Sequence, residues 1–149
     1  MRYTAPVPNL DSHCKAMPSD YNVLIVDDEP SVALTLKLIF ERQSYAISVA
    51  YSCVEALQML RDGGVYDAVI TDLNMEREDI GLEVVRAAQQ LRPRPVVVIC
   101  TGYANQYNAQ AALDLRVDYL ATKPVDLQEL LIAVERLLRR RQLTHEATA

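Results

Sequence analysis

Five polar residues stand directly after short apolar runs, where their side chains could act together. They are two adjacent carboxylates after NVLIV, a third after DAVIT, the threonine that ends PVVVICT and the lysine of YLATKP: Asp27, Asp28, Asp72, Thr101 and Lys123. Taken singly, each has an ordinary explanation as a helix cap, a turn residue or a solvated loop cation. Together they supply the carboxylates, the hydroxyl and the ammonium that phosphoryl chemistry uses.

The three carboxylates predict a metal site. Carboxylates a few ångströms apart resist joint ionisation unless a cation neutralises them. Mg²⁺ binds a few carboxylates together with waters and phosphate oxygens, so Asp27, Asp28 and Asp72 could hold it without a closed cage. With the metal on one side of a phosphoryl group and Lys123 on the other, one carboxylate could attack in line. Asp72, at the end of a central strand, is the best placed.

The segments that must position these residues alternate regularly along the chain. The β-branched runs that predict strands cover residues 22–27, 46–50, 67–71, 95–101 and 117–121. The amphipathic segments that predict helices lie near residues 30–43, 53–62, 81–91, 104–115 and 126–141. This alternation indicates right-handed βαβ units around a doubly wound parallel sheet, an α/β fold. In such a sheet, functional groups collect at the carboxyl ends of the strands.

The last predicted helix has the clearest pattern. Its apolar stripe recurs at spacings of three and four residues: Leu127, Leu130, Leu131, Val134, Leu137 and Leu138. The arginine run 139–141 follows at the negative end of the helix dipole, which favours a solvated helix terminus over a nucleic-acid patch. We expect a loosely ordered extension at residues 1–20, one domain at 21–141 and a polar tail at 142–149, with no output domain.

Composition limits the classes of partner. The chain has 149 residues, half of them hydrophobic, which suits a single domain. Its net charge of -5 argues against direct binding to nucleic acid or to an anionic membrane. The odd, widely spaced Cys14, Cys53 and Cys100 fit reduced thiols, and no apolar stretch reaches membrane-spanning length. We therefore expect a soluble, cytoplasmic protein.

Four separated pieces of the chain, VLIVDDEP, YDAVITDLNM, VVVICTGYA and ATKPVD, occur in an order and at spacings that resemble the receiver domain of two-component response regulators. The resemblance covers roughly residues 22–141. It implies a flavodoxin-like fold, a five-stranded parallel sheet of strand order 2-1-3-4-5 with five helices. It also implies a phosphoryl donor, namely a phosphohistidine on a sensor histidine kinase or a histidine phosphotransfer protein.

The resemblance assigns roles to the residues that match the family motifs. Asp72 would be the phosphoacceptor. Asp28 would bind Mg²⁺ directly, Asp27 would act largely through water, and the backbone carbonyl of Asn74 would complete the metal shell.

The remaining roles concern switching. Thr101 would be the switch hydroxyl, and Lys123 would pair with the phosphoryl group. A receiver assists its own phosphorylation and dephosphorylation, so it is not a conventional enzyme. Phosphorylation would alter a protein-binding face formed by the fourth helix, the fifth strand and the fifth helix.

The sequence departs from the family pattern in two places. After the acceptor, Glu76 stands where the family has proline, Ile80 stands where it has glycine, and Gly81 follows one place later, which suggests a one-residue insertion. On the fifth strand, Leu120 occupies the position of the switch aromatic and Tyr119 is displaced by one. A regular strand would point Tyr119 to the opposite face, whereas a bulge would restore the aromatic.

The leading hypothesis is a stand-alone receiver that is phosphorylated on Asp72 in a Mg²⁺-dependent reaction and then relays the phosphoryl group or binds an unknown downstream protein. The alternative is a phosphorylation-independent interaction module on the same fold. A third class, a Mg²⁺-dependent phosphohydrolase, is disfavoured because Asn74 stands where such enzymes have their general acid. Transcriptional control would require another protein, because no helix-turn-helix region follows residue 141.

Overall fold

The structure of the chain is a computed structural model that describes residues 21–75, 80–102 and 106–148. Within these residues five strands and five helices alternate: β1 (Asn22–Val26), α1 (Pro30–Arg42), β2 (Ala46–Ala50), α2 (Cys53–Arg61), β3 (Ala68–Thr71), α3 (Gly81–Gln89), β4 (Val96–Thr101), α4 (Gln106–Asp114), β5 (Tyr119–Thr122) and α5 (Leu127–Thr148). The predicted extension at residues 1–20 lies outside the described residues.

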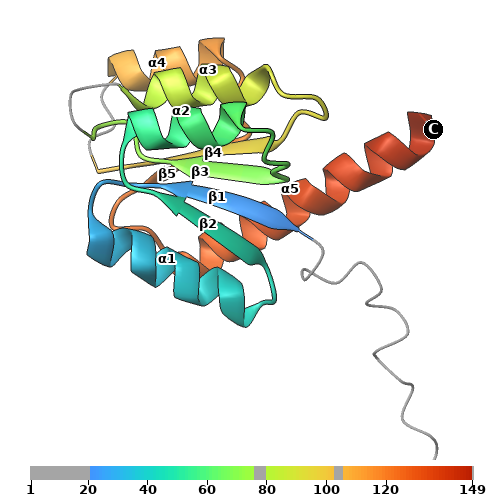
Figure 1. Ribbon diagram of the computed structural model, residues 1–149, viewed down its shortest axis with the longest axis horizontal. Coiled ribbons are helices and arrows are strands. Elements are labelled where there is room, and N and C mark those ends of the chain that lie inside the picture. Colours follow the sequence, from blue (N-terminus) through green and yellow to red (C-terminus); the bar gives the residue numbers. More distant parts are fainter. Residues whose placement is uncertain (1–20, 76–79, 103–105, 149) are drawn as a thin grey trace, which may run out of the picture.

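The sheet has the predicted topology. Its five strands lie in the order β2-β1-β3-β4-β5, and every neighbouring pair is parallel. Helices α1 and α5 cover one face, and α2, α3 and α4 cover the other (Figure 1). The fold is therefore the doubly wound α/β fold that the strand and helix pattern predicts, with the flavodoxin-like strand order that the resemblance to receiver domains implies.

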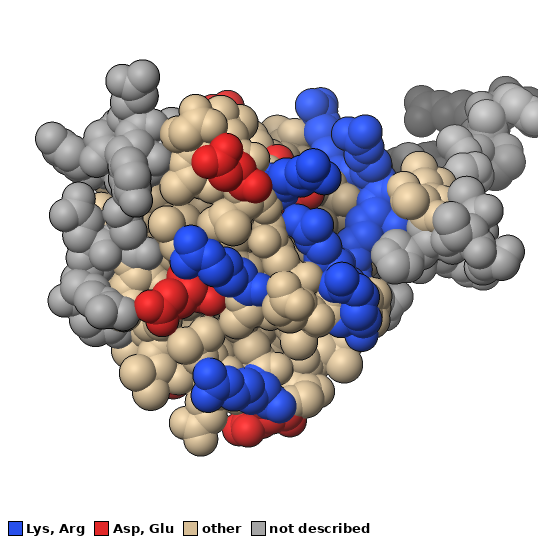
Figure 2. Space-filling view, turned by 90° about the horizontal axis from the view of Figure 1, so that it is seen from above, with Lys and Arg blue, Asp and Glu red and all other residues tan. Residues whose placement is uncertain are grey.

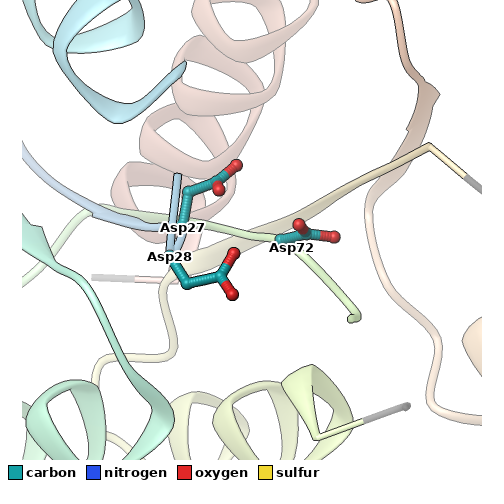
Figure 3. Close-up of side chains that lie close together, drawn as sticks. All are labelled: Asp27, Asp28 and Asp72. Carbon is teal, nitrogen blue, oxygen red and sulfur yellow. The ribbon is translucent and has the colours of Figure 1, made fainter. Parts of the chain in front are cut away.

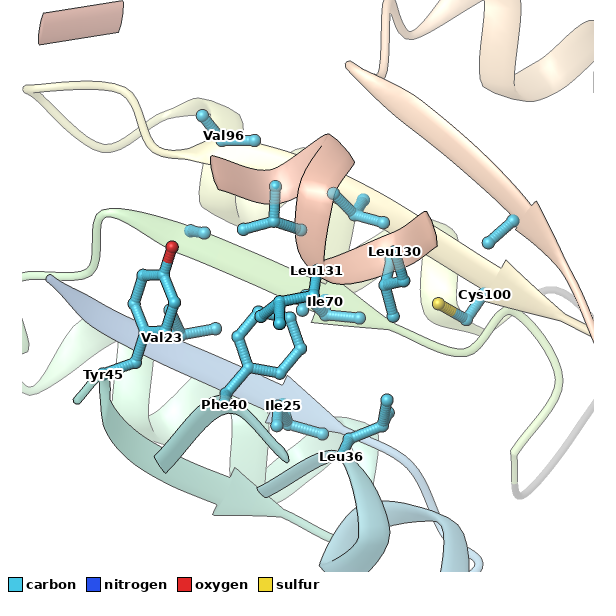
Figure 4. Packing of buried hydrophobic residues seen from close by; sticks show 14 of the residues in the cluster. Val23, Ile25, Leu36, Phe40, Tyr45, Ile70, Val96, Cys100, Leu130 and Leu131 are labelled. Carbon is cyan, nitrogen blue, oxygen red and sulfur yellow. The ribbon is translucent and has the colours of Figure 1, made fainter. Parts of the chain in front are cut away.

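Each face of the sheet has its own hydrophobic core. On the α1–α5 side, Phe40 is completely buried and meets the ring of Tyr45 edge-on at 5.4 Å. Leu130 of α5 belongs to the same core, as Figure 4 shows. Strands β3 and β4 are buried along their whole length, which explains why their sequences are uniformly apolar rather than alternating.

Helix α5 is longer than the sequence pattern predicted. It continues to Thr148, through the stretch expected to be a polar tail. Residues 142–148 contain neither glycine nor proline, so nothing in the sequence ends the helix there. Two contacts beyond the domain core anchor it: the Tyr21 hydroxyl donates to Gln142 Oε1 at 2.7 Å, and Arg141 Nη1 pairs with Asp67 Oδ1 at 3.1 Å. None of the helices in the described part of the chain is long and apolar enough to cross a bilayer.

Helix α3 begins at a glycine that lies against the backbone of β3. The amide of Gly81 donates to the Leu73 carbonyl at 2.8 Å. A β-carbon added to Gly81 would overlap the carbonyl oxygen of Asp72 and would lie 2.7 Å from the α-carbon of Leu73. Because these are backbone atoms, the added carbon cannot be accommodated by a rotamer change. Gly81, one place later than the family pattern, therefore supplies the close approach that this connection requires.

We predict that Gly81→Ala destabilises the fold by about 1–3 kcal/mol, because overpacking against backbone forces the β3–α3 connection to move. Chemical denaturation of the variant measures this change. The matched control is Gly102→Ala, whose added carbon would meet Lys123 only at ordinary contact distances of 3.7–3.8 Å. The control should stay within about 0.5 kcal/mol of the parent protein. A stabilised Gly81→Ala, the usual effect of alanine at the start of a helix, would contradict the prediction.

Candidate phosphoacceptor site

The predicted carboxylates meet at the carboxyl edge of the sheet. Asp27 and Asp28 follow β1 and Asp72 follows β3, and the parallel pairing of these strands brings the residues together. One carboxylate oxygen of each lies within 4.8 Å of the others, and Figure 3 shows the side chains converging. Asp27 and Asp72 are 2% and 6% exposed, whereas Asp28 is exposed to solvent. The strand ends thus place three acidic groups in one site, as predicted.

Lys123, at the end of β5, bridges two of these carboxylates. Its ammonium group donates to Asp27 Oδ2 at 2.8 Å and to Asp72 Oδ2 at 3.1 Å, and its side chain is 18% exposed. The sequence placed Lys123 beside the phosphoryl group but did not predict its contact with Asp27. The contact arises because the ends of β1, β3 and β5 lie at one edge of the sheet.

Backbone amides hold the other oxygens of the buried carboxylates. Glu29 N–H donates to Asp27 Oδ1 at 2.9 Å, and Asn74 N–H donates to Asp72 Oδ1 at 3.2 Å. Sequence reasoning missed the Glu29 amide. Pro30 could have indicated this contact, because proline favours the first position of a helix. Backbone amides around a helix start have no partner within the helix and therefore need an acceptor outside it. Asp27 therefore has both oxygens engaged, while Asp28 keeps acceptor capacity toward solvent.

Burial and charge act in opposite directions on the ionisation of the site. Burial raises the pKa of Asp72 above its ordinary value, and the charge and hydrogen bond of Lys123 only partly offset this effect. For Lys123, burial disfavours the charged form. The hydrogen bond to Asp27 and the charges of Asp72 and Asp27 outweigh burial and raise the pKa of the ammonium. Lys123 thus stays protonated beside the Asp72 carboxylate, which is costly to ionise.

The donor set fits a hard divalent cation. All three side chains of the cluster offer carboxylate oxygens, the hard ligands that Mg²⁺ prefers. Two of the carboxylates are buried beside one lysine, so the three acidic groups carry more negative charge than the lysine neutralises. The cluster of Asp27, Asp28 and Asp72 can therefore bind Mg²⁺ through hard oxygen ligands.

Thr101 ends β4 and is completely buried. Its carbonyl accepts the Lys123 amide at 2.7 Å, and it pairs with Thr122 in the sheet.

Cys100, its neighbour, belongs to the core between the sheet and α1–α5, where burial raises the pKa of the thiol to about 12. The thiol is therefore protonated near neutral pH and contributes packing rather than a nucleophile.

Strand β5 pairs regularly with β4 from Tyr119 to Thr122. Leu120 is partly buried and packs against the core on the α2–α4 side, whereas Tyr119 packs against the core on the α1–α5 side. The Tyr119 hydroxyl donates to Glu129 Oε1 of α5 at 3.4 Å. The bulge that would have restored an aromatic at the switch position is not present in this strand, and leucine occupies that position. Glu76, the other departure, lies outside the described residues.

Comparisons with known proteins agree with this geometry. The family model of the response regulator receiver domain matches residues 23–135. The crystal structure of a CheY-like response regulator receiver domain protein from Methanospirillum hungatei JF-1 superposes with a TM-score of 0.77 at 26% sequence identity, covering 83% of this chain and 98% of that one.

Full-length regulators are also similar over the same part of the chain. Response regulator ArlR of Staphylococcus saprophyticus is 31% identical over 118 residues, which are 79% of this chain and 52% of ArlR. The TorCAD operon transcriptional regulatory protein TorR of Escherichia coli K12 is 29% identical over 127 residues, 85% of this chain and 54% of TorR. The chain spans about half the length of these relatives. With the topology, the acidic cluster and the matched residues in agreement, the chain belongs to the response regulator receiver domain family of two-component signalling.

Proposed function

We propose that the chain accepts a phosphoryl group on Asp72 from a phosphohistidine donor in a Mg²⁺-dependent reaction. The observation that carries the proposal is the arrangement of Asp72, which lies within 4.8 Å of Asp27 and Asp28 and in contact with Lys123. A cation and a metal site beside one carboxylate are the parts that phosphoryl transfer requires. The donor would be a sensor histidine kinase or a histidine phosphotransfer protein, since receiver domains act with histidine kinases.

The residues divide the work as follows. Asp28, Asp27 and Asp72, with the backbone carbonyl of Asn74, would hold Mg²⁺, and Asp27 would act largely through water because both of its oxygens are engaged. The bound ion would neutralise charge on the phosphoryl oxygens. Asp72 would form the new oxygen–phosphorus bond while the nitrogen–phosphorus bond of the donor breaks, which leaves an acyl phosphate on the aspartate. As negative charge moves from the Asp72 carboxylate to the phosphoryl oxygens, the Lys123 ammonium would donate its hydrogen bond to those oxygens instead.

Switching would begin at Thr101, whose hydroxyl would turn to the phosphoryl group, and would reach the face formed by α4, β5 and α5. Leucine at position 120 removes the aromatic partner of this movement. We therefore propose that coupling between Thr101 and this face is weaker than in receivers with an aromatic at this position. That the chain acts without a further domain stays a prediction.

A second candidate function rests on the same observation about β5. Because Leu120 is packed against the core and Tyr119 faces α5, the receiver fold could bind a partner without responding to phosphorylation. Two-component signalling would then use this chain as a constitutive interaction module.

We predict that incubation with Mg²⁺ and acetyl phosphate adds the mass of one phosphoryl group to the protein, because Asp72 is held beside Lys123 and the acidic cluster. Asp72→Ala should abolish the adduct, as measured by intact mass spectrometry. The matched control is Asp62→Ala, which removes an exposed aspartate at the end of α2. No adduct on the parent protein, or an unchanged adduct on Asp72→Ala, would overturn the proposed function.

We predict that Asp72→Asn stabilises the protein at pH 7 in the presence of a chelator, by roughly 1 kcal/mol. The pKa of Asp72 is raised in the folded state. Its contribution to stability is therefore present below the unfolded pKa of about 3.9 and is lost as the pH rises through the folded pKa. The amide avoids the cost of a buried charge, and Lys123 keeps its contact with Asp27.

Thermal unfolding of the parent protein and of Asp72→Asn across pH tests whether the substitution stabilises the fold. The stability difference should shrink toward acid pH, where the carboxyl group is protonated. Added Mg²⁺ should stabilise the parent protein more than Asp72→Asn, by mass action on the folded state. Asp62→Asn, the surface control, should behave like the parent. An Asp72→Asn protein that unfolds more readily at pH 7 without metal would show that ionised Asp72 stabilises the fold.

The two candidate functions differ in how phosphorylation affects partner binding. If the site switches the α4–β5–α5 face, a partner captured by the phosphorylated protein should bind Asp72→Ala at least about fivefold more weakly. Quantitative pull-down followed by titration of the captured protein measures this ratio. Equal affinity for the two forms would favour the constitutive module.

A further inference from the structure

A second hollow lies at the edge of the sheet opposite the aspartates. It has a volume of about 450 Å³ and is lined by four arginines: Arg94, Arg116, Arg140 and Arg141. Two of them stand in the connections that lead into β4 and β5, and two stand in the C-terminal half of α5. Pro95 and Leu137 add apolar surface to the lining. Three separate segments of the chain thus build one basic cavity.

Most of the positive charge around this cavity is uncompensated. Arg94, Arg116 and Arg140 have no carboxylate within ion-pair distance among the residues that the structure describes. The one acidic residue in the lining, Asp118, accepts the Val97 amide at 2.8 Å through its carboxylate and offsets only part of the positive charge. In a chain whose net charge is -5, this concentration of cations is unexpected. Figure 2 shows Lys and Arg side chains gathering toward the end of the molecule from which α5 projects.

Two of the arginines are held by contacts to the protein. Arg141 Nη1 pairs with Asp67 Oδ1 at 3.1 Å, and the side chain is 16% exposed. Its Nε is buried without a hydrogen-bond partner among the described residues, a situation that costs about 1–3 kcal/mol. Arg94 Nη2 donates to the Arg116 carbonyl at 3.3 Å, which links the two connections. Contacts within the protein thus hold the side chains of Arg94 and Arg141 in place. The Nε of Arg141 still lacks a hydrogen-bond partner among the described residues.

We propose that this cavity binds a small organic phosphate, of a size up to a mononucleotide. Guanidinium groups match the planar, bidentate geometry of phosphate oxygens, and three of the four arginines around this hollow have no carboxylate partner among the described residues. The apolar lining suits a ligand with a less polar body beside its phosphates. A volume of about 450 Å³ lies in the range of small-molecule sites, and the open hollow has room for a ligand of this size.

The shape of the site favours a small ligand over a nucleic acid chain. A polynucleotide tracks an extended basic stripe or groove, whereas these arginines surround a single hollow on an otherwise acidic protein. Because Pro95 and Asp118 stand before β4 and β5, the cavity lies at the far end of the strands from Asp72. The proposal therefore does not depend on phosphorylation of Asp72.

The test is a titration of the full chain, in chelator, with pyrophosphate, AMP, ADP, ATP and adenosine, followed by amide chemical shifts. Saturable shifts should appear at residues 94–97, 116–118 and 140–141 and should strengthen with the number of phosphates, while adenosine should give none. Chelator removes Mg²⁺ and so keeps phosphate binding at Asp72 out of the measurement. Arg140→Gln should weaken binding of ATP at least about fivefold.

The matched control is Arg139→Gln on the same helix, because it removes the same charge from an arginine that pairs with Glu135 and does not line the cavity. It should leave ATP affinity within about twofold of the parent. Equal losses in the two variants would reduce the site to general charge attraction and overturn the proposal. So would the absence of saturable binding up to about 10 mM of every probe. Tighter binding of a short single-stranded oligonucleotide than of ATP would reassign the surface to nucleic acid.

Discussion

The ammonium group of Lys123 lies between two nearly buried carboxylates, and the geometry of this acidic edge of the sheet depends on the contact. Asp27 and Asp72 are less than one-tenth exposed, so their negative charges need a partner inside the protein. Loss of the lysine would leave both carboxylates without their cation, and an uncompensated buried charge typically costs about 3–5 kcal/mol. The contact can form only if the ends of β1, β3 and β5 lie at the same edge. The site and the sheet topology therefore support each other.

The two cores of the domain keep this edge in place. Strands β1, β3 and β4 are apolar on both faces because α1 and α5 cover one side of the sheet and α2, α3 and α4 cover the other. The carboxylates sit just beyond these buried strands, where backbone amides of Glu29 and Asn74 supply hydrogen bonds. Gly81 fixes the return of the chain against Asp72. A rigid scaffold thus holds groups whose own charges oppose close packing.

The opposite ends of the sheet have opposite electrostatic character. One end gathers the carboxylates of Asp27, Asp28 and Asp72, and the other gathers the arginines around the hollow. Strands β4 and β5 lie between these two ends, and Leu120 stands on β5 where the family pattern has an aromatic residue. The acidic cluster matches the receiver family motifs, whereas position 120 departs from them.

The sequence by itself determined the strands to within about two residues and the edge at which the acidic residues meet, because periodicity along the chain and the alternation of strands with helices can be seen in the sequence. The strand order followed from the resemblance to receiver domains. The sequence also set the site apart from a chance acidic cluster, since four separated motifs agreed. Only the tertiary structure decided the regular pairing that turns Tyr119 away from the Leu120 side, and the contact of Lys123 with Asp27. It alone brought together the arginines around the cavity. These features depend on register and on contacts between residues distant in sequence, which periodicity along the chain does not encode.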